Sequence, residues 1–299
     1  METIITCFIF CIVLFMYIHI FFHLNTSDDL EVYEIDQPSK EKLEEICDIK
    51  QPVVFNFNNE KFNETCIREV INNNYTAFDV KVRNVKEEYT DDTELYMPLT
   101  FGACMTLLTN DNENKYITEN NQDFLEESAL IKTYRYNDEF LRPQMVSSCK
   151  YDYLAASNNT TTPLRYEVNY RNYYYVTEGN IKIKLTPSRS DKYLNKLVDY
   201  DNCETRSLLN PWDVQQQYKA DYDKVKFLEI TVNKGDIVFI PAYWWYSIKF
   251  ENNASVCVFK YQTYMNSIAI SPYTIMCSLQ RNNVKRETFK KMIFDNKID

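Results

Sequence analysis

The sequence predicts a mainly β domain with flanking helices, of the α+β class, preceded by one N-terminal transmembrane helix. Two observations lead to this prediction. The first is a run of 21 residues without a formal charge, from Ile4 to Leu24. The second is a series of short segments from Leu164 onward, in which β-branched and aromatic residues alternate with polar ones. Such segments, separated by turn residues, are typical of an antiparallel barrel or sandwich.

The N-terminal run has the length of a membrane span. As a helix rising about 1.5 Å per residue, residues 4–24 would cover about 31 Å, which matches a hydrocarbon core of about 30 Å. A cleaved signal peptide is the alternative, but it requires basic residues before the apolar run and small residues at the cleavage site. Residues 1–3 contain no basic residue, and residues 22–24 contain no small residue. We therefore predict an uncleaved signal-anchor over residues 1–24, which contacts the lipid bilayer through residues 4–24 of a single-pass membrane protein.

The side of the membrane on which the domain lies is left open, because neither flank of the run is rich in Lys or Arg. Sequons that would make the protein a glycoprotein occur at Asn25, Asn63, Asn74, Asn158, Asn159 and Asn253. The abundance of Asn, Lys, Ile and Tyr is what an AT-rich genome produces, such as that of a large DNA virus. The membrane is then a host endomembrane or, for a viral source, that of the virion.

Charge and composition exclude several classes of function. The net charge is −10, and no basic stripe is interleaved with aromatic residues, so binding of nucleic acid through its phosphates is not expected. The cysteines outside the apolar run are odd in number and form no C-x-x-C pair, so they indicate neither a zinc site nor a disulfide framework. The chain has only two histidines, His19 and His23, and both lie in the apolar run.

The first half of the predicted domain mixes helices and strands. An acidic linker over residues 25–38 leads into the main domain, predicted over residues 39–270, and a helical extension follows over residues 271–299. Ser39 is the expected N-cap of the first helix, because Leu43, Ile46 and Cys47 follow at helical spacing. The expected helices cover residues 39–49, 65–72 and 97–108, and the expected strands cover residues 51–57, 77–85 and 115–120.

The second half of the domain is predicted to consist almost entirely of strands. Its alternating segments cover residues 164–178, 180–188, 226–233, 235–242, 244–250 and 255–265. Pro211 and the polar residues that follow it, up to Lys224, indicate a helical or irregular insertion between these strands.

Two of these segments resemble the cupin-like JmjC family of iron- and 2-oxoglutarate-dependent oxygenases. GDIVFIPAYWWYSI (Gly235–Ile248) is similar to the late barrel strand of the family, and TPLRYEVNYRNYYYVTEGNIKIKLTPS (Thr162–Ser188) is similar to an earlier pair of strands. The closest resemblance is to the asparaginyl hydroxylases that act on hypoxia-inducible factor and ankyrin repeats. The resemblance covers most of residues 40–266 and implies a double-stranded β-helix (jelly-roll or cupin) core. The residues that carry its structural motif are Gly235, Asp236, Pro241, Trp244 and Trp245.

The resemblance also shows where the metal ligands of the family would lie. Arg165 and Tyr246 occupy the positions of its two histidines, and Glu167 occupies that of its carboxylate. A site of this type holds Fe(II) through two neutral imidazoles and one carboxylate. A guanidinium stays protonated and offers no lone pair, so Arg165 cannot be a ligand. We therefore predict that the chain binds no metal and no cofactor.

The co-substrate pocket is altered as well. Thr162 matches a threonine that helps to hold 2-oxoglutarate in the family, but Ile181 stands where the family has a lysine. Lys182 is one residue away, so it should point to the opposite face of the strand.

The spacing of Arg165 and Glu167 suggests which interactions replace the metal at these positions. Arg165 and Glu167 are two residues apart on a predicted strand, so both side chains should face the barrel interior. We expect Arg165 to pair with Glu167, and Tyr246 to donate a hydrogen bond to the same carboxylate from the opposite strand.

These observations favour a membrane-anchored, catalytically inactive domain that acts as a protein-interaction or structural module, in a virion if the source is viral, with an unknown protein partner. Two alternatives stay open. The former active site could bind a small anionic or sugar ligand, since Arg165, Lys182 and the tyrosine-rich residues 169–176 surround it. The chain could also be an active Fe/2-oxoglutarate hydroxylase with an unusual metal site.

Overall fold

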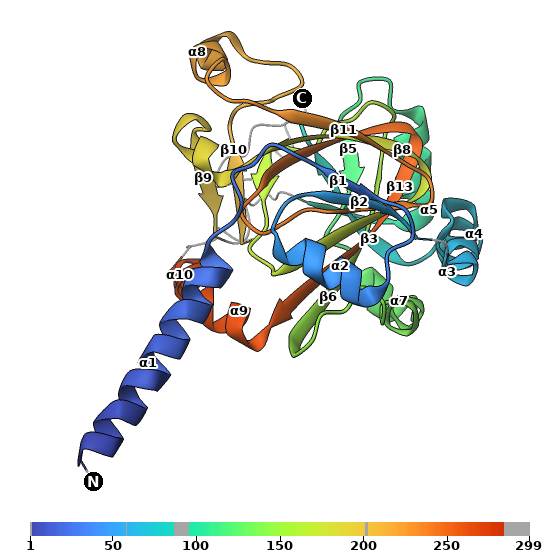
Figure 1. Cartoon of the computed structure of the whole chain (residues 1–299). Coiled ribbons are helices and arrows are strands. Elements are labelled where there is room, and N and C mark those ends of the chain that lie inside the picture. The colour runs from blue at the N-terminus through green and yellow to red at the C-terminus, as the bar shows by residue number, and fades with distance from the viewer. Residues whose placement is uncertain (1, 58, 87–95, 201–202, 284–299) are drawn as a thin grey trace, which may run out of the picture.

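The computed structural model describes residues 2–57, 59–86, 96–200 and 203–283. Within them, a long N-terminal helix, α1 (Glu2–Leu24), leads into a β-rich domain flanked by short helices (Figure 1). These shorter helices are α2 (Lys40–Asp48), α3 (Glu60–Cys66), α4 (Arg68–Tyr75), α5 (Phe101–Asn110), α6 (Gln122–Glu127), α7 (Ile131–Asn137), α8 (Lys219–Tyr222), α9 (Tyr264–Ala269) and α10 (Ser271–Asn283), with 3-10 turns η1 (Ser188–Tyr193) and η2 (Gln216–Tyr218).

The strands form one connected sheet in the order β1-β2-β12-β8-β13-β6-β5-β3-β4, with β7, β9, β10 and β11 attached to it. The strands are β1 (Tyr33–Ile35), β2 (Val53–Asn56), β3 (Asp79–Asn84), β4 (Met97–Thr100), β5 (Tyr116–Thr118), β6 (Val146–Ala156), β7 (Arg165–Tyr166), β8 (Arg171–Thr186), β9 (Lys196–Asp199), β10 (Glu204–Ser207), β11 (Leu228–Asn233), β12 (Asp236–Phe239) and β13 (Trp245–Thr263). The predicted class, mainly β with flanking helices, is confirmed.

The long antiparallel pair β8 and β13 is the spine of this sheet. Their register shifts between Glu251 and Ser255, opposite Gly179. Gly179 has a φ of +65°, and a Cβ there would lie 2.7 Å from the backbone oxygens of Glu251 and Asn252. Only glycine fits so close an approach in the left-handed region. Each long strand therefore continues past the irregularity and pairs with different neighbours on its two sides.

Successive side chains of β8 point alternately into two hydrophobic cores. Tyr173 and Tyr175 pack with the helix layer, whereas Tyr174 and Val176 pack with the residues that fill the barrel interior. All four side chains are buried. The tyrosine-rich segment is therefore a wall between two cores and not an exposed platform.

The first predicted helix is confirmed, together with its cap. The Ser39 side chain accepts a hydrogen bond from the backbone N–H of Lys42 at the start of α2, and Leu43, Ile46 and Cys47 are buried. The predicted helix over residues 97–108 is wrong in its first turn. Met97–Thr100 is a strand that pairs with β3, and α5 begins only at Phe101, with the Thr100 side chain as its cap.

The start of the domain differs from the predicted boundary, and the structure describes only the first part of the predicted C-terminal extension. The sheet begins inside the segment predicted to be a linker, because β1 pairs in parallel with β2 from Tyr33↔Val53 onward. This short strand has no buried alternating face, so its sequence carries no strand pattern. At the other end, α10 begins where the extension was predicted, and residues 284–299 of that extension lie outside the described residues.

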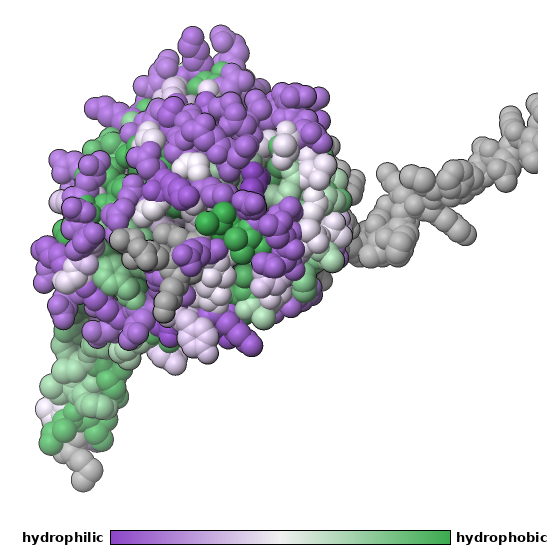
Figure 2. All heavy atoms as spheres, turned by 90° about the vertical axis from the view of Figure 1, so that its right-hand side faces the viewer, coloured by the Kyte–Doolittle hydropathy of each residue, from purple (hydrophilic) through white to green (hydrophobic). Residues whose placement is uncertain are grey.

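By its length and composition, α1 is able to cross a membrane, and a signal sequence passes the same test. Figure 2 shows its apolar surface projecting below the domain, whose side facing the viewer is largely hydrophilic.

Candidate functional site

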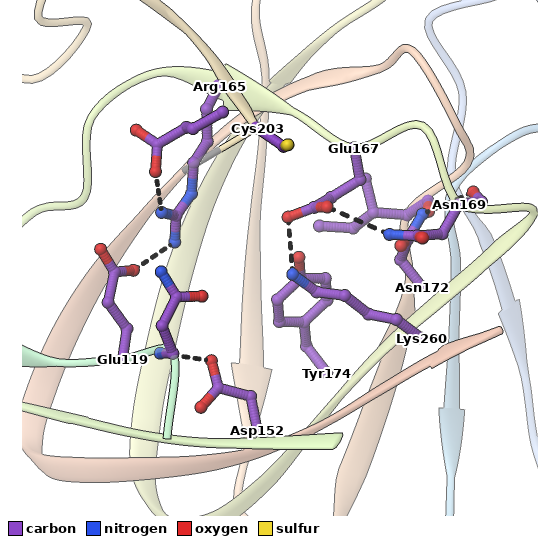
Figure 3. Close-up of polar contacts among 12 residues, drawn as sticks. Glu119, Asp152, Arg165, Glu167, Asn169, Asn172, Tyr174, Cys203 and Lys260 are labelled. Carbon is purple, nitrogen blue, oxygen red and sulfur yellow. Dashed lines mark hydrogen bonds and ion pairs between the residues drawn. The ribbon is translucent and has the colours of Figure 1, made fainter. Parts of the chain in front are cut away.

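A cavity of about 270 Å³ opens in the barrel wall where β6, β7, β8 and β13 meet the start of β10. Seven charged side chains contribute to its lining: Glu119, Lys150, Asp152, Arg165, Glu167, Glu204 and Lys260. Arg83 lies behind them and contacts Glu119 and Glu204. With Arg83 included, the cations and carboxylates balance, so the cavity has no excess positive charge that would select an anionic ligand. Six of these eight ionic side chains form two separate groups (Figure 3).

The first group is an arginine–glutamate network made of Arg83, Glu119, Arg165 and Glu204. Arg165 contacts Glu119 at 2.6 Å (Nη2 to Oε2) and Glu204 at 3.1 Å (Nη1 to Oε2). Arg83 Nη1 contacts the same two carboxylates at 3.0 and 3.2 Å. Each of the four side chains is less than a tenth exposed, so two buried guanidinium groups neutralise two buried carboxylates.

Strand pairing brings this network together from distant parts of the chain. Arg165 lies opposite Arg206 of β10, and β10 begins at Glu204. Arg83 of β3 lies opposite Ile117 of β5, two residues before Glu119. Burial alone would raise the pKa of Glu119, but the Arg165 and Arg83 guanidinium groups outweigh burial and lower the pKa to about 2.

The second group is centred on Glu167, and we call it the Lys260–Glu167 cluster. Lys260 Nζ lies 2.7 Å from Glu167 Oε1, and the Tyr246 hydroxyl donates to the same oxygen at 3.1 Å. Tyr174 donates to the Tyr246 hydroxyl at 2.7 Å, and Asn169 Nδ2 donates to Glu167 Oε2 at 3.2 Å. Both oxygens of Glu167 therefore already accept hydrogen bonds.

The electrostatics of this cluster keep Glu167 charged. Burial would raise the pKa of Glu167, but the Lys260 ammonium outweighs burial and leaves the pKa below its ordinary value. Burial, together with the nearby Glu167 carboxylate, raises the pKa of Tyr246 to about 12, so the tyrosine stays protonated and acts as a donor.

The predicted pairing of Arg165 with Glu167 is wrong. Figure 3 shows Arg165 directed toward Glu119 and Glu167 directed toward Lys260. Both side chains do line the same cavity, as their spacing predicts, but each finds a partner of opposite charge on another strand or loop. The predicted hydrogen bond from Tyr246 to Glu167 is present.

Sequence reasoning missed four residues of the site: Arg83, Glu119, Glu204 and Lys260. Two of them carried a signal. Lys260 follows the continuous apolar run 256–259, and Arg83 follows the buried Val82 in a strand of alternating character. A charged residue inside a buried strand requires a partner, although its identity depends on the fold.

The predicted co-substrate positions are occupied by other interactions. The Thr162 hydroxyl accepts a hydrogen bond from the backbone N–H of Ile248 at 2.9 Å, so it holds the segment before β7 against β13. Ile181 is fully buried in the barrel core. Lys182 points to the other face of β8, where it pairs with Glu251 at 2.9 Å.

The residues of the structural motif lie at the start of β12 and in the turn between β12 and β13. Gly235, with a φ of +93°, forms the turn before β12, and Asp236 accepts a hydrogen bond from Asn56 Nδ2 at 3.0 Å. Pro241 lies in the turn after β12, and its carbonyl accepts a hydrogen bond from the backbone N–H of Trp244. Trp244 and Trp245 are fully buried, and the Trp245 indole N–H donates to Asp191.

The side chains at the three positions of the metal site do not fit Fe(II). Arg165 offers no lone pair, Glu167 is held by Lys260 and Tyr246, and Tyr246 is a protonated phenol. Across the described residues, no group of three or more His, Cys, Asp or Glu side chains is arranged to hold a metal ion.

Comparison with known proteins agrees with this architecture. The family model described as a cupin-like domain matches residues 32–264, from the residue before β1 to the first residue of α9. No curated protein matches the chain.

Proposed function

The chain belongs to the family of cupin-like domains, and from that premise we propose that it is a membrane-anchored, catalytically inactive member that serves as a protein-interaction or structural module. The inactive state concerns iron- and 2-oxoglutarate-dependent oxygenation, the activity implied by the resemblance of Thr162–Ser188 and Gly235–Ile248 to JmjC oxygenases.

One observation carries this proposal. Arg165, at the position of a metal-binding histidine, is buried and held by Glu119 at 2.6 Å and Glu204 at 3.1 Å. Its permanent positive charge lies where a divalent cation would otherwise neutralise nearby carboxylates. An iron ion in this place would lie beside the Arg165 guanidinium, which neither loses its proton nor offers a lone pair.

The surroundings of the site support the same conclusion. The second histidine position is Tyr246, whose hydroxyl is part of the hydrogen-bond chain from Tyr174 to Glu167. The position of the co-substrate lysine is Ile181, inside the apolar core. A 2-oxoglutarate carboxylate would have no cation to bind at that point on the barrel wall.

The anchor is the second part of the proposal. Residues 2–15 of α1 are exposed along every side, and most of these side chains are large and apolar. In water such a surface would be a strong aggregation site, whereas in a bilayer it is an ordinary span.

Iron binding and co-substrate turnover test the inactive state. The full chain, purified in detergent, should retain no iron after anaerobic loading with Fe(II) and should not decarboxylate 2-oxoglutarate. A triple variant, Arg165→His, Tyr246→His and Lys260→Met, is the matched control, because it restores two imidazoles and frees Glu167. Stoichiometric iron in the unaltered chain, with turnover lost in Glu167→Ala, would contradict the proposal.

Membrane extraction tests the anchor separately. The chain should stay with the membrane pellet in alkaline carbonate and should keep its N-terminal residues by intact mass. A soluble product that begins after Leu24 would show instead that residues 1–24 are a cleaved signal sequence.

A further inference from the structure

The last two turns of α1 do not stand free, because they pack against the domain. Met16, His19, Ile20 and His23 are at least partly buried, at the i, i+3, i+4, i+7 spacing of one helix face. α1 lies against α9, and the His23 ring packs edge-on against Tyr170 at 4.9 Å between centroids. Before Met16, every described residue of α1 is exposed.

This packing limits how far the domain can stand from a bilayer. The free part of α1, residues 2–15, is about 21 Å long at about 1.5 Å per residue, but a hydrocarbon core is about 30 Å thick. About 9 Å of the core must then be crossed by the turns that are packed on the domain. The domain surface beside those turns must therefore lie within the membrane interface.

The chemistry of that surface suits such a position. Residues 261–280, which include α9 and most of α10, contain no charged side chain, in a protein of which 25% of the residues are charged. Figure 1 shows α9 beside the end of α1 that enters the domain, and α10 packs against α9.

The outer side of α10 is apolar although it faces away from the domain. Ile275, Met276 and Leu279 share one helix face and are 58%, 48% and 56% exposed. The inner side carries Cys277, which is buried, and Tyr273, which donates to the carbonyl of Cys203. This helix is therefore attached to the domain on one side and presents a second apolar stripe outward.

On α9, Tyr264 and Ile268 are one helical turn apart, and they are 59% and 43% exposed. We call Tyr264, Ile268, Ile275, Met276 and Leu279 the α9–α10 surface. An amphipathic helix in a bilayer interface buries its apolar face by about 5–10 Å, the same depth that the length of α1 requires.

We propose that the α9–α10 surface is inserted in the interface of the lipid bilayer that α1 spans, so that the domain lies on the membrane and does not hang from a linker. This inference rests on the proposed anchor. The continuity of the surface with the packed turns of α1 selects lipid as the occupant over a second copy of the chain.

Site-specific photocrosslinking tests the inference on the full chain in phosphatidylcholine nanodiscs. A diazirine amino acid is placed at position 279 in the α9–α10 surface, at position 10 in the free part of α1, or at position 136 on α7. Tyr136 is the matched control, since it is 84% exposed and belongs to α7, which lies on the other side of the domain from α1 (Figure 1). Lipid adducts are then counted by mass spectrometry.

Lipid adducts at position 279 should be several-fold more abundant than at position 136 and should accompany adducts at position 10. Adducts at position 10 with position 279 no higher than position 136 would overturn the inference and leave the anchor standing. Absence of lipid adducts at all three positions would remove both. Crosslinks from position 279 to a second protein chain would identify the surface as a protein interface and also overturn the inference.

Discussion

The arginine–glutamate network and the Lys260–Glu167 cluster line the same cavity, yet they differ in how fully they are sealed. In the network, each side chain is less than a tenth exposed, and two guanidinium groups share two carboxylates. In the cluster, Lys260 and Glu167 are 20% and 18% exposed, and the remaining contacts of Glu167 are neutral hydrogen bonds.

This difference in exposure implies different roles for the two groups. A buried pair has little net effect on stability while it is complete, but it is strongly destabilising when one partner is removed. Water that reaches the Lys260–Glu167 cluster weakens its Coulomb energy and can replace a lost partner. Removing one partner of the network should therefore be strongly destabilising, whereas the cluster is the part of the cavity that solvent or a ligand could still reach.

The largest expected effect comes from cutting the network. Arg165→Met should lower the free energy of unfolding by about 3 kcal/mol, the lower end for breaking a buried pair, because Arg83 still contacts both carboxylates. Denaturant unfolding of the purified chain measures this loss. Lys182→Met is the matched control, since it removes an exposed partner of Glu251 and should cost at most about 1 kcal/mol. Equal losses in the two variants would refute a structural role for the network.

The second largest effect is expected from acid, which should weaken the arginine–glutamate network. The pKa of Glu119 is about 2 in the folded chain and 4.5 ordinarily, so its contribution is complete above pH 4.5 and is lost as the pH falls toward 2. The stability of the unaltered chain should therefore drop more steeply over this window than that of Glu119→Gln, which has no carboxyl to protonate. Unfolding free energies measured at intervals across the window give both slopes. Parallel slopes would show that Glu119 is not held charged by its arginines.

Cutting the more open cluster should cost less. Lys260→Met leaves Glu167 with hydrogen bonds from Tyr246 and Asn169 and with access to water, so we expect a loss of about 2 kcal/mol. The same denaturant measurement applies. A loss as large as that of Arg165→Met would mean that both groups are equally sealed, which would end the distinction drawn between them.

The smallest effect should come from removing one hydroxyl. Tyr246→Phe deprives Tyr174 of its acceptor and Glu167 of one donor, for an expected loss of about 1 kcal/mol. Tyr136→Phe, at an exposed position, is the control and should be neutral. If Tyr246→Phe is also neutral, the hydrogen-bond chain does not contribute to the stability of the cluster.

Helices and strands that bury one face could be predicted from the local spacing of apolar residues. The helix after Ser39 and the strands around Gly235 follow from spacing and turn residues. By contrast, β6 (Val146–Ala156) was not predicted, since its first half, with the pattern of a partly exposed edge, lacks clear alternation. The prediction of helix at Met97–Thr100 is wrong because pairing with β3, which no local pattern reveals, imposes the extended conformation.

The sequence alone determined that residues 25–299 contain no histidine and that one helix is long and apolar enough to cross a membrane. It also predicted that Arg165, Glu167 and Tyr246 stand at the positions of a ligand set. These properties depend on residue identity and on near neighbours in the chain. Only the tertiary structure decided that Glu119 and Glu204 neutralise Arg165, that Lys260 neutralises Glu167, and that α1 packs on α9. Buried charges pair with whatever opposite charge barrel closure brings within hydrogen-bonding distance, and that distance is set by strands far apart in sequence.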